Sequence, residues 1–317
     1  MPLNEFNLIE RYFTSKALSR DDIIVGIGDD AAIVAIPPNQ HLVITTDTLV
    51  SGVHFFPETP AHDIAYKSLA VNLSDLAAMG ATPAWFTLAL TLPHVDEPWL
   101  EAFSSELFLL ANSVNIRLIG GDMTSGPLSI TIQAMGCVPP HQGLLRSGAK
   151  PGDSIYVTGT LGDAGLALRA YQSGDLKNIP DADFLWQRLT RPTPRLAMGY
   201  ALRDLASSCI DISDGLAADL GHILTASHVG ARIDITKLPL SLALQGIAAE
   251  QAQVIALTSG DDYELCFTVS PEKESLLRQL RLQNCPYHAI GVITQERGLC
   301  DNQGNPVVLP QTGWQHF

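Results

Sequence analysis

Five short stretches of the sequence each place aspartate among small residues. DISDGLAADLG (211–221) sets two carboxylates three residues apart, where a strand is expected to end and a helix to begin. The other four stretches are GIGDDAA (26–32), TTDTL (45–49), NLSDLAAMGA (72–81) and GGDMTSG (120–126). Carboxylates, hydroxyls and backbone carbonyls together suit hard divalent cations, above all magnesium, which shares its shell with water and substrate phosphates. The candidate ligands are Asp30, Thr45, Thr46, Asp47, Asp75, Asp122, Asp211 and Asp214.

Some of these aspartates also have a purely structural interpretation. Asp214 precedes GLAADLGHIL and could be the N-cap of a helix, and Asp30 could belong to a turn with Asp29. Asp75 is different, because it lies in a predicted helix of Leu, Ala and Met, where a buried carboxylate without a partner is poorly tolerated. We therefore expect Asp75 to face a cation or a polar cleft. TTDT follows a predicted strand, and ligands collect at the carboxyl ends of strands in open α/β sheets.

Familiar nucleotide-binding and hydrolase motifs do not account for the sequence. GIGDDA fits G-x-G-x-x-A, but its two aspartates would repel a dinucleotide pyrophosphate unless metal ions intervened. GLLRSGAK (143–150) approaches a P-loop, yet Ala149 stands where that motif requires lysine. The sequence has no G-x-S-x-G or H-E-x-x-H, and its nine histidines show no ligand spacing. The chemistry must therefore rest on the aspartates.

The elements that must position these residues read as a mixed α/β chain. In the first half, apolar periodicity predicts strands at 41–48, 83–92, 116–122 and 128–138 and helices at 61–79 and 97–114. The densest Pro/Gly stretch, 139–153, then predicts a boundary between an N-terminal domain, 1–138, and a C-terminal domain, 139–317. The second half is predicted to hold strands at 154–160, 232–235, 263–269 and 286–293 and helices from 161 to 172, 195–207, 214–227 and 271–283.

The composition indicates which binding partners and which cellular compartment to expect. The net charge of −14 argues against nucleic acid and anionic membranes, which need stripes of Lys and Arg. Five cysteines without a C-x-x-C pair are typical of free thiols in a reducing compartment. No stretch approaches 18 uninterrupted apolar residues, and the N-terminus does not resemble a signal peptide. We expect a cytoplasmic protein that does not enter a membrane.

Taken together, the chain resembles the thiamine-monophosphate kinases, a family of the aminoimidazole-ribonucleotide synthetase-like superfamily of ATP-using enzymes. The resemblance covers nearly the full length, and the order of its motifs is specific. Besides the five stretches above, it rests on LLRSGAKPGD, TGTLGDAG, SGDDYELCFT and the terminal GWQHF. It implies a two-domain α/β (mixed α+β) fold, in which the N-terminal sheet forms a barrel with that of a second copy and the C-terminal α/β domain completes the active site.

The resemblance also implies roles for particular residues. The eight candidate ligands would hold several magnesium ions. ATP would contact Gly121, Asp122, Arg146 and Ser213. The thiamine site would be lined by His54, Glu264 and Phe317, and Trp314 is added because an aromatic side chain near the terminus could stack on a ring. Glu264 could instead point to solvent from a half-buried strand.

The implied reaction is the ATP-dependent phosphorylation of thiamine monophosphate to thiamine diphosphate by a homodimer. A phosphate monoester has a second pKa of about 6, so the acceptor oxygen is already anionic and needs no general base. What the reaction needs is cations between the acceptor and the γ-phosphate of ATP.

Other members of the superfamily are alternatives to this family. Selenophosphate synthetase would carry a Cys or Sec near its N-terminus, and the first cysteine here is Cys137. The hydrogenase-maturation relative uses a C-terminal cysteine, whereas this chain ends in GWQHF. An amidine-forming purine-biosynthesis enzyme and a non-catalytic nucleotide-binding regulator stay as alternatives.

Overall fold

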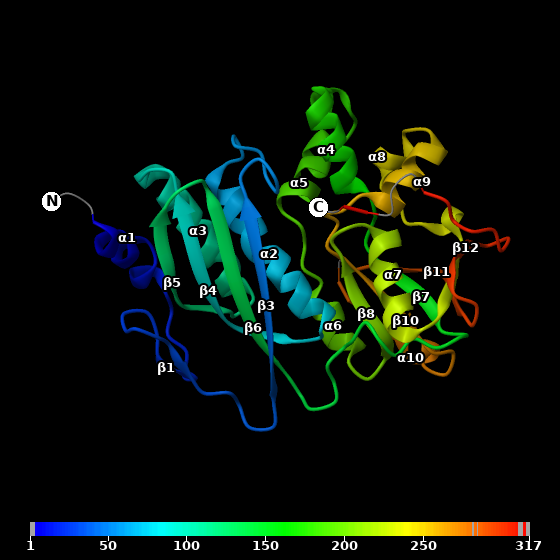
Figure 1. Ribbon diagram of the computed structural model, residues 1–317, viewed down its shortest axis with the longest axis horizontal. Coiled ribbons are helices and arrows are strands. Elements are labelled where there is room, and N and C mark those ends of the chain that lie inside the picture. The colour runs from blue at the N-terminus through cyan, green and yellow to red at the C-terminus, as the bar shows by residue number, and fades with distance from the viewer. Residues whose placement is uncertain (1–3, 281, 284, 310–312, 315–317) are drawn as a thin grey trace. The chain divides into compact units, whose positions relative to one another are not determined.

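The computed structural model describes residues 4–280, 282–283, 285–309 and 313–314 (Figure 1). The chain divides into two compact units, one of residues 1–76 and 81–141 and the other of residues 77–80 and 142–317. The main segment of the second unit begins at Gln142, inside the Pro/Gly-rich stretch where the sequence predicts a domain boundary. Both units combine helices with a β-sheet, as predicted.

The first unit is built on a four-stranded sheet in the order β3-β6-β4-β5. β6 runs antiparallel to both of its neighbours, whereas β4 and β5 are parallel. The helix between β4 and β5 is α3, and α2 connects β3 to β4. The elements of this unit are α1 (Glu5–Tyr12), β1 (Ile23–Val25), β2 (Ile33–Val34), β3 (His41–Val50), α2 (Ala61–Ala78), β4 (Thr82–Leu92), α3 (Glu97–Ser113), β5 (Arg117–Ser125) and β6 (Ser129–Val138), with a 3₁₀ turn at Thr14–Lys16.

The two faces of this sheet differ in chemistry. Successive strand residues point to opposite faces, so residues paired across the strands form rows on one face. One row, Leu49-Ile130-Leu90-Met123, is buried. The neighbouring row, Thr48-Thr131-Ala89-Asp122, lies on the other face, and its Thr48, Ala89 and Asp122 are exposed. The sheet therefore buries one face in its own unit and presents part of the other to solvent.

The second unit has a six-stranded sheet in the order β12-β9-β11-β7-β10-β8, in which only the β12 and β9 pair is parallel. Its strands are β7 (Ser154–Thr158), β8 (Ala206–Ile212), β9 (Gly230–Ile233), β10 (Glu264–Val269), β11 (Tyr287–Thr294) and β12 (Gly298–Asp301). Its helices are α4 (Asp163–Ser173), α5 (Ala182–Thr190), α6 (Leu196–Leu202), α7 (Leu216–Ser227), α8 (Leu242–Gln245), α9 (Ala249–Thr258) and α10 (Glu274–Leu277), with 3₁₀ turns at Leu176–Asn178 and Ile235–Lys237.

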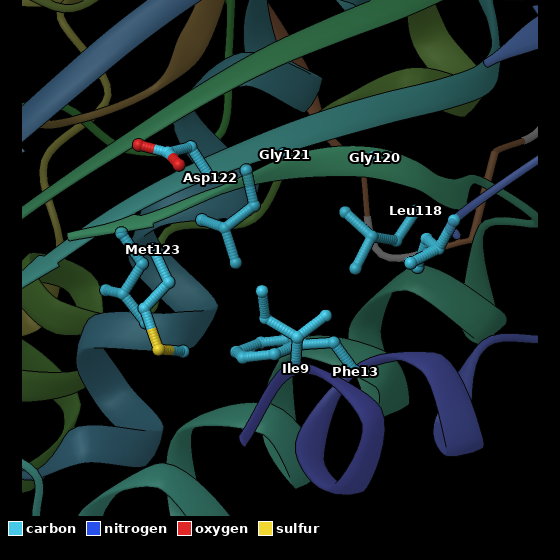
Figure 2. A pocket seen from close by; sticks show the side chains of 10 residues that line it. Ile9, Phe13, Leu118, Gly120, Gly121, Asp122 and Met123 are labelled. Carbon is cyan, nitrogen blue, oxygen red and sulfur yellow. The ribbon is translucent and has the colours of Figure 1, made fainter. Parts of the chain in front are cut away.

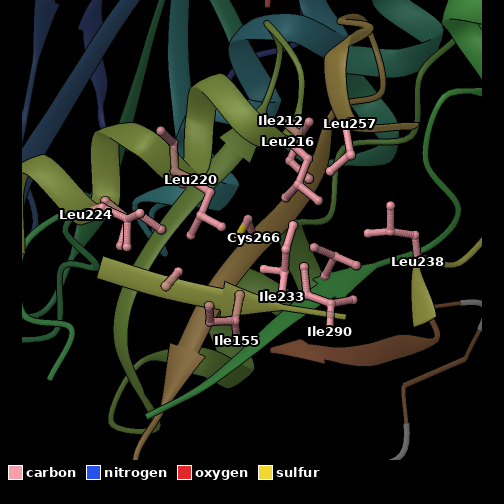
Figure 3. Close-up of a cluster of buried hydrophobic side chains, with 14 of the residues drawn as sticks. Ile155, Ile212, Leu216, Leu220, Leu224, Ile233, Leu238, Leu257, Cys266 and Ile290 are labelled. Atoms are coloured by element: carbon pink, nitrogen blue, oxygen red, sulfur yellow. The ribbon is translucent and has the colours of Figure 1, made fainter. Parts of the chain in front are cut away.

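The core of this unit lies between α7 and the sheet (Figure 3). Leu216, Leu220 and Ile223 recur at helical spacing along α7 and are fully buried. They pack with strand residues such as Ile155 and Cys266. Each such side chain stabilises the fold by roughly 1.5–3 kcal/mol. This packing fixes the start of α7, and with it the end of β8 that carries Asp211.

Some predicted element boundaries are wrong. The helix predicted at 195–207 ends at Leu202, and β8 begins at Ala206 after a residue, Asp204, whose φ is +21°. Of the helix predicted at 271–283, the described residues form only the short α10. The sequence patterns do not predict helices α1, α5, α8 and α9. The long central elements agree within a few residues, because their apolar periodicity is strong.

Candidate functional site

The strongest pair of predicted ligands in the first unit joins β3 to α2. The Thr45 hydroxyl donates a hydrogen bond to Oδ2 of Asp75, a half-buried side chain of α2. Asp47 lies two residues further along the same face of β3. Burial, and then the nearby charge of Asp75, raise the pKa of Asp47 to about 7. Two carboxylates that repel each other in this way favour a cation that would relieve the repulsion.

Asp122 occupies the opposite edge of the same sheet. Asp47 belongs to the row Asp47-Ile132-Leu88-Gly121, whereas Asp122 lies in the next row and points to the other face. With strands about 4.8 Å apart, β3 and β5 are separated by about 14 Å in this sheet. Asp47 and Asp122 of one chain therefore cannot bind the same metal ion. Thr46 is on the face of Asp122, and its hydroxyl accepts a hydrogen bond of 3.4 Å from Gln133 Nε2.

An apolar pocket opens beside Gly121 and Asp122. Figure 2 shows Ile9 and Phe13 across from the Gly120 to Met123 segment, with the Asp122 carboxylate turned away from them. Gly121 cannot carry a side chain here, because a Cβ would lie 1.9 Å from the carbonyl oxygen of Leu88. The pocket could take a flat apolar ring. It is lined by Ile9, Phe13, Ile27, Leu88, Leu90, Leu118, Gly120, Gly121, Asp122 and Met123.

Asp30 and His54 lie on turns of the first unit. Asp30 is exposed, and its N–H donates to Asp29 Oδ1 at 2.8 Å, as the turn interpretation predicts. His54 is half-buried, and its Nδ1 accepts the N–H of Val50 at 3.0 Å, so a neutral ring carries its proton on Nε2. Lys67 Nζ donates to the His54 carbonyl at 3.2 Å and ties this turn to α2.

In the second unit, three predicted residues follow one another at the end of β8. Asp211 is buried, and Ser213 and Asp214 are partly exposed in the turn before α7. The N-cap of α7 is Gly215, and Asp219 Oδ2 accepts the N–H groups of Asp214 and Gly215, each at 3.0 Å. The N-cap interpretation of Asp214 is thus wrong. Burial, together with the charge of Asp214, raises the pKa of Asp219 to about 7 despite these N–H donors.

Two other segments meet this turn. The N–H of Asp261 donates to the Ser213 carbonyl at 2.8 Å, and the N–H of Trp314 donates to the Asp214 carbonyl at 3.0 Å. Trp314 is 52% exposed. The predicted residue Phe317 lies outside the described residues. The structure therefore places Ser213, Asp214 and Trp314 together.

Glu264 and Arg146 sit in contrasting surroundings. Glu264 is fully buried at the start of β10 and forms ion pairs with Arg188 and Arg195, so it does not point to solvent. Its predicted contact with thiamine stays a prediction. Arg146 is exposed, and its carbonyl accepts a hydrogen bond of 3.3 Å from Ser227 Oγ.

The sequence patterns indicate no role for Asp219, Asp262, Arg188 and Arg195. Asp219 lies in DISDGLAADLG, and Asp262 is part of SGDDYELCFT, in which the resemblance implies a role only for Glu264. Across the described part of the chain, no three acidic, His or Cys side chains form a group that could hold a metal ion. A metal ion here would need further ligands from water and phosphate, as magnesium usually has.

Comparison with known proteins places the whole chain in one family. It matches the family model described as AIR synthase related protein, N-terminal domain, over residues 28–138, and the corresponding C-terminal domain over residues 150–299. It is 54% identical to the thiamine-monophosphate kinase of Escherichia coli (strain K12), over 100% of this chain and 99% of that protein.

Solved structures give the same result. The crystal structure of thiamine-monophosphate kinase from Stenotrophomonas maltophilia K279a is similar with a TM-score of 0.88 and 49% identity, over 97% of this chain and 99% of that one. The structure described as AaThiL complexed with AMPPCP and TMP is similar with a TM-score of 0.79 and 30% identity, over 100% of this chain and 99% of that one.

Proposed function

Because the chain belongs to the thiamine-monophosphate kinase family of AIR synthase related proteins, we propose that it transfers the γ-phosphate of ATP to thiamine monophosphate, which gives thiamine diphosphate. The predicted family is therefore confirmed. The observation that carries the function is the 54% identity over the whole chain to a thiamine-monophosphate kinase. A relative of the same fold was solved with AMPPCP and TMP together. These likenesses favour the kinase over an amidine-forming purine enzyme and over a non-catalytic regulator.

The residues on β3 and α2 fit magnesium. Asp47, Asp75 and Thr45 offer the hard oxygen donors that this ion prefers. Burial is the main reason that the pKa of Asp47 is raised, and the charge of Asp75 adds to it; a bound cation would offset both. Bound magnesium would supply positive charge between two anionic phosphates. The protein's own contribution is to hold these oxygens on β3 and on the largely buried helix α2. A protein base is not needed, because the acceptor phosphate is already anionic at neutral pH.

We propose that the active form is a homodimer in which a second copy completes the metal site. Asp122 is too far from Asp47 in one chain, but the sheet has two open edges at β3 and β5. Leu42 and Ile44 are 36% and 55% exposed on β3, which suits burial against a second sheet. Pairing of two such sheets into a barrel would bring β5 of the partner to β3. The partner's Asp122 would then lie on the same face as Thr46, which adjoins Asp47 along β3.

We place the nucleotide beside Gly121 and Asp122. The apolar pocket between this segment and Phe13 suits a nucleobase. In the second unit, we assign Ser213 to ATP, Asp214 to magnesium and Trp314 to the thiamine ring, as the resemblance to the family implies.

The remaining partners and the compartment follow the composition. The net charge of −14 gives no support to nucleic-acid binding. In the described part of the chain, we find no helix with the length and apolar character needed to cross a membrane. Each of the five cysteines is free, which agrees with a cytoplasmic location.

The test of this function is product identification. Purified protein with ATP, magnesium and thiamine monophosphate should form thiamine diphosphate and ADP in equal amounts, as measured by chromatography. Asp47→Asn should reduce the rate by at least about a hundredfold, because it removes a charge-bearing oxygen ligand. Asp175→Asn, which changes an exposed acid elsewhere, serves as the matched control and should keep the wild-type rate. Wild-type protein that makes ADP without thiamine diphosphate would refute the proposal.

A further inference from the structure

Glu264 has all of its acceptor positions occupied by protein donors. Arg195 binds the carboxylate through two hydrogen bonds: its Nε donates to Oε2 at 2.6 Å, and its Nη2 donates to Oε1 at 2.5 Å. Arg188 Nη2 donates to Oε1 at 3.0 Å, and the Thr158 hydroxyl donates to Oε2 at 2.6 Å. A carboxylate accepts about four hydrogen bonds. Glu264 is fully buried as well, so it has neither access nor capacity for a ligand.

The same network holds together segments that are far apart in the sequence. Arg188 Nη2 also donates to the carbonyls of Thr160 and Asp262, at 3.2 and 3.3 Å. Asp262 Oδ2 in turn accepts the N–H of Gly162 at 2.7 Å. The connection between β7 and α4, the end of α5 and the loop 259–263 are therefore fastened to one another around the Glu264 carboxylate.

The loop 259–263 bears directly on the turn at the end of β8. Asp261 N–H donates to the Ser213 carbonyl, and Tyr263 N–H donates to the Ile212 carbonyl, each at 2.8 Å. The contact is so close at Gly260 that a Cβ there would lie 2.2 Å from the Ser213 carbonyl oxygen.

The backbone of this loop is strained. Asp261 and Tyr263 have φ values of +66° and +50°, which residues other than glycine rarely adopt. Such a conformation persists only when the surrounding structure holds it in place. The Glu264 network lies beside this loop, and Arg188 binds the carbonyl of Asp262 between the two strained residues.

We propose that Glu264 is a positioning residue: with Arg188 and Arg195 it holds the loop 259–263, and through it the backbone of Ser213 and Asp214. It acts on the ATP and magnesium side of the reaction and does not touch thiamine monophosphate. The inference rests on the proposed function for its kinetic readout, and on the geometry alone for the position of the loop.

The kinetic test separates the two substrates. Glu264→Gln keeps the shape of the side chain but removes the negative charge that two guanidiniums bind. We expect the KM for ATP and the magnesium concentration at half-maximal rate to rise about tenfold, equivalent to about 1.4 kcal/mol. The KM for thiamine monophosphate should stay within about twofold of wild type. Arg195→Lys keeps its charge but loses the planar fork, so it should shift the same two quantities.

The matched control is Val269→Ala, which removes a fully buried side chain from the far end of the same strand, outside the network. It should lower the thermal midpoint without shifting the KM for ATP. A rise in the KM for thiamine monophosphate alone in Glu264→Gln would overturn the proposal, as would an equal shift for ATP in Val269→Ala.

Hydrogen exchange gives a readout that needs no turnover. The amides of residues 213–215 and 261–263 should exchange faster in Glu264→Gln than in Val269→Ala when each variant is measured the same number of degrees below its thermal midpoint. Equal exchange in the two variants would overturn the positioning role. If wild-type protein makes no thiamine diphosphate, the proposed function fails, and this measurement still decides whether Glu264 positions the loop.

Discussion

Replacing Gly121 with alanine should break the contact between β4 and β5, because the new methyl group would meet the backbone of the neighbouring strand. The Cβ would lie 1.9 Å from the Leu88 carbonyl oxygen and 2.8 Å from its carbon, and real Cβ contacts essentially never fall below 3.0 Å. The two strands must therefore separate by about 1 Å, where their normal spacing is about 4.8 Å. Overpacking of this kind costs about 1–3 kcal/mol, and weakened ladder hydrogen bonds add about 1 kcal/mol.

The neighbouring glycine supplies the control. A Cβ on Gly120 would meet nothing within 4 Å, so Gly120→Ala should change stability by less than about 0.5 kcal/mol. By differential scanning calorimetry we expect Gly121→Ala to lower the midpoint of its unit by about 5–10 °C. It should also weaken ATP binding, since Gly121 lines the pocket assigned to the nucleobase. Equal midpoints for the two variants would refute the close approach of β4 to Gly121.

Two further predictions concern charge and assembly. Burial raises the pKa of Asp262 well above its usual range. The folded protein therefore keeps the proton of the Asp262 carboxyl to higher pH than the unfolded chain does. The stability that this protonation contributes is lost as pH rises through the raised pKa. The thermal midpoint should thus fall more between about pH 5 and pH 8 in wild type than in Asp262→Asn, and equal falls would contradict this origin. If the metal site combines two copies, Asp47→Asn and Asp122→Asn should each be inactive alone. Dimers re-formed from an equal mixture of the two variants should regain about a quarter of wild-type activity. Half of these dimers contain one copy of each variant, and each such dimer has one intact site out of two. No recovery in mixed dimers, shown to form by a tag on one chain, would contradict the composite site.

Local patterns in the sequence account for much of the first unit. The alternation in HLVITTDT and the helical spacing of Leu69, Leu73 and Leu76 predict β3 and α2, and the structure has both. A carboxylate inside such a helix predicts that Asp75 faces a cation or a polar cleft, and the structure shows the Thr45 hydroxyl donating a hydrogen bond to it. What the pattern could not show is the strand order. That order places Asp47 and Asp122 on opposite edges, and it arises from contacts between distant segments.

Glu264 shows a second limit of reading the sequence alone. The alternation of Tyr263, Leu265 and Phe267 is typical of a half-buried strand, but β10 lies between β7 and β8 and is buried on both faces. The arginines that pair with Glu264 are 76 and 69 residues away along the chain. No local signal connects residues at such a distance, so the network could be found only from the folded structure.

The most direct test of the central claim follows the transferred phosphate itself. ATP labelled in its γ-phosphate should be incubated with the protein, magnesium and thiamine monophosphate, and the products should be resolved by phosphorus NMR. Direct transfer predicts that all of the label in the thiamine product occupies the terminal phosphate of thiamine diphosphate, one for each ADP formed, and that chelation of magnesium abolishes it. Label that appears only as inorganic phosphate, or thiamine diphosphate without label, would contradict the account.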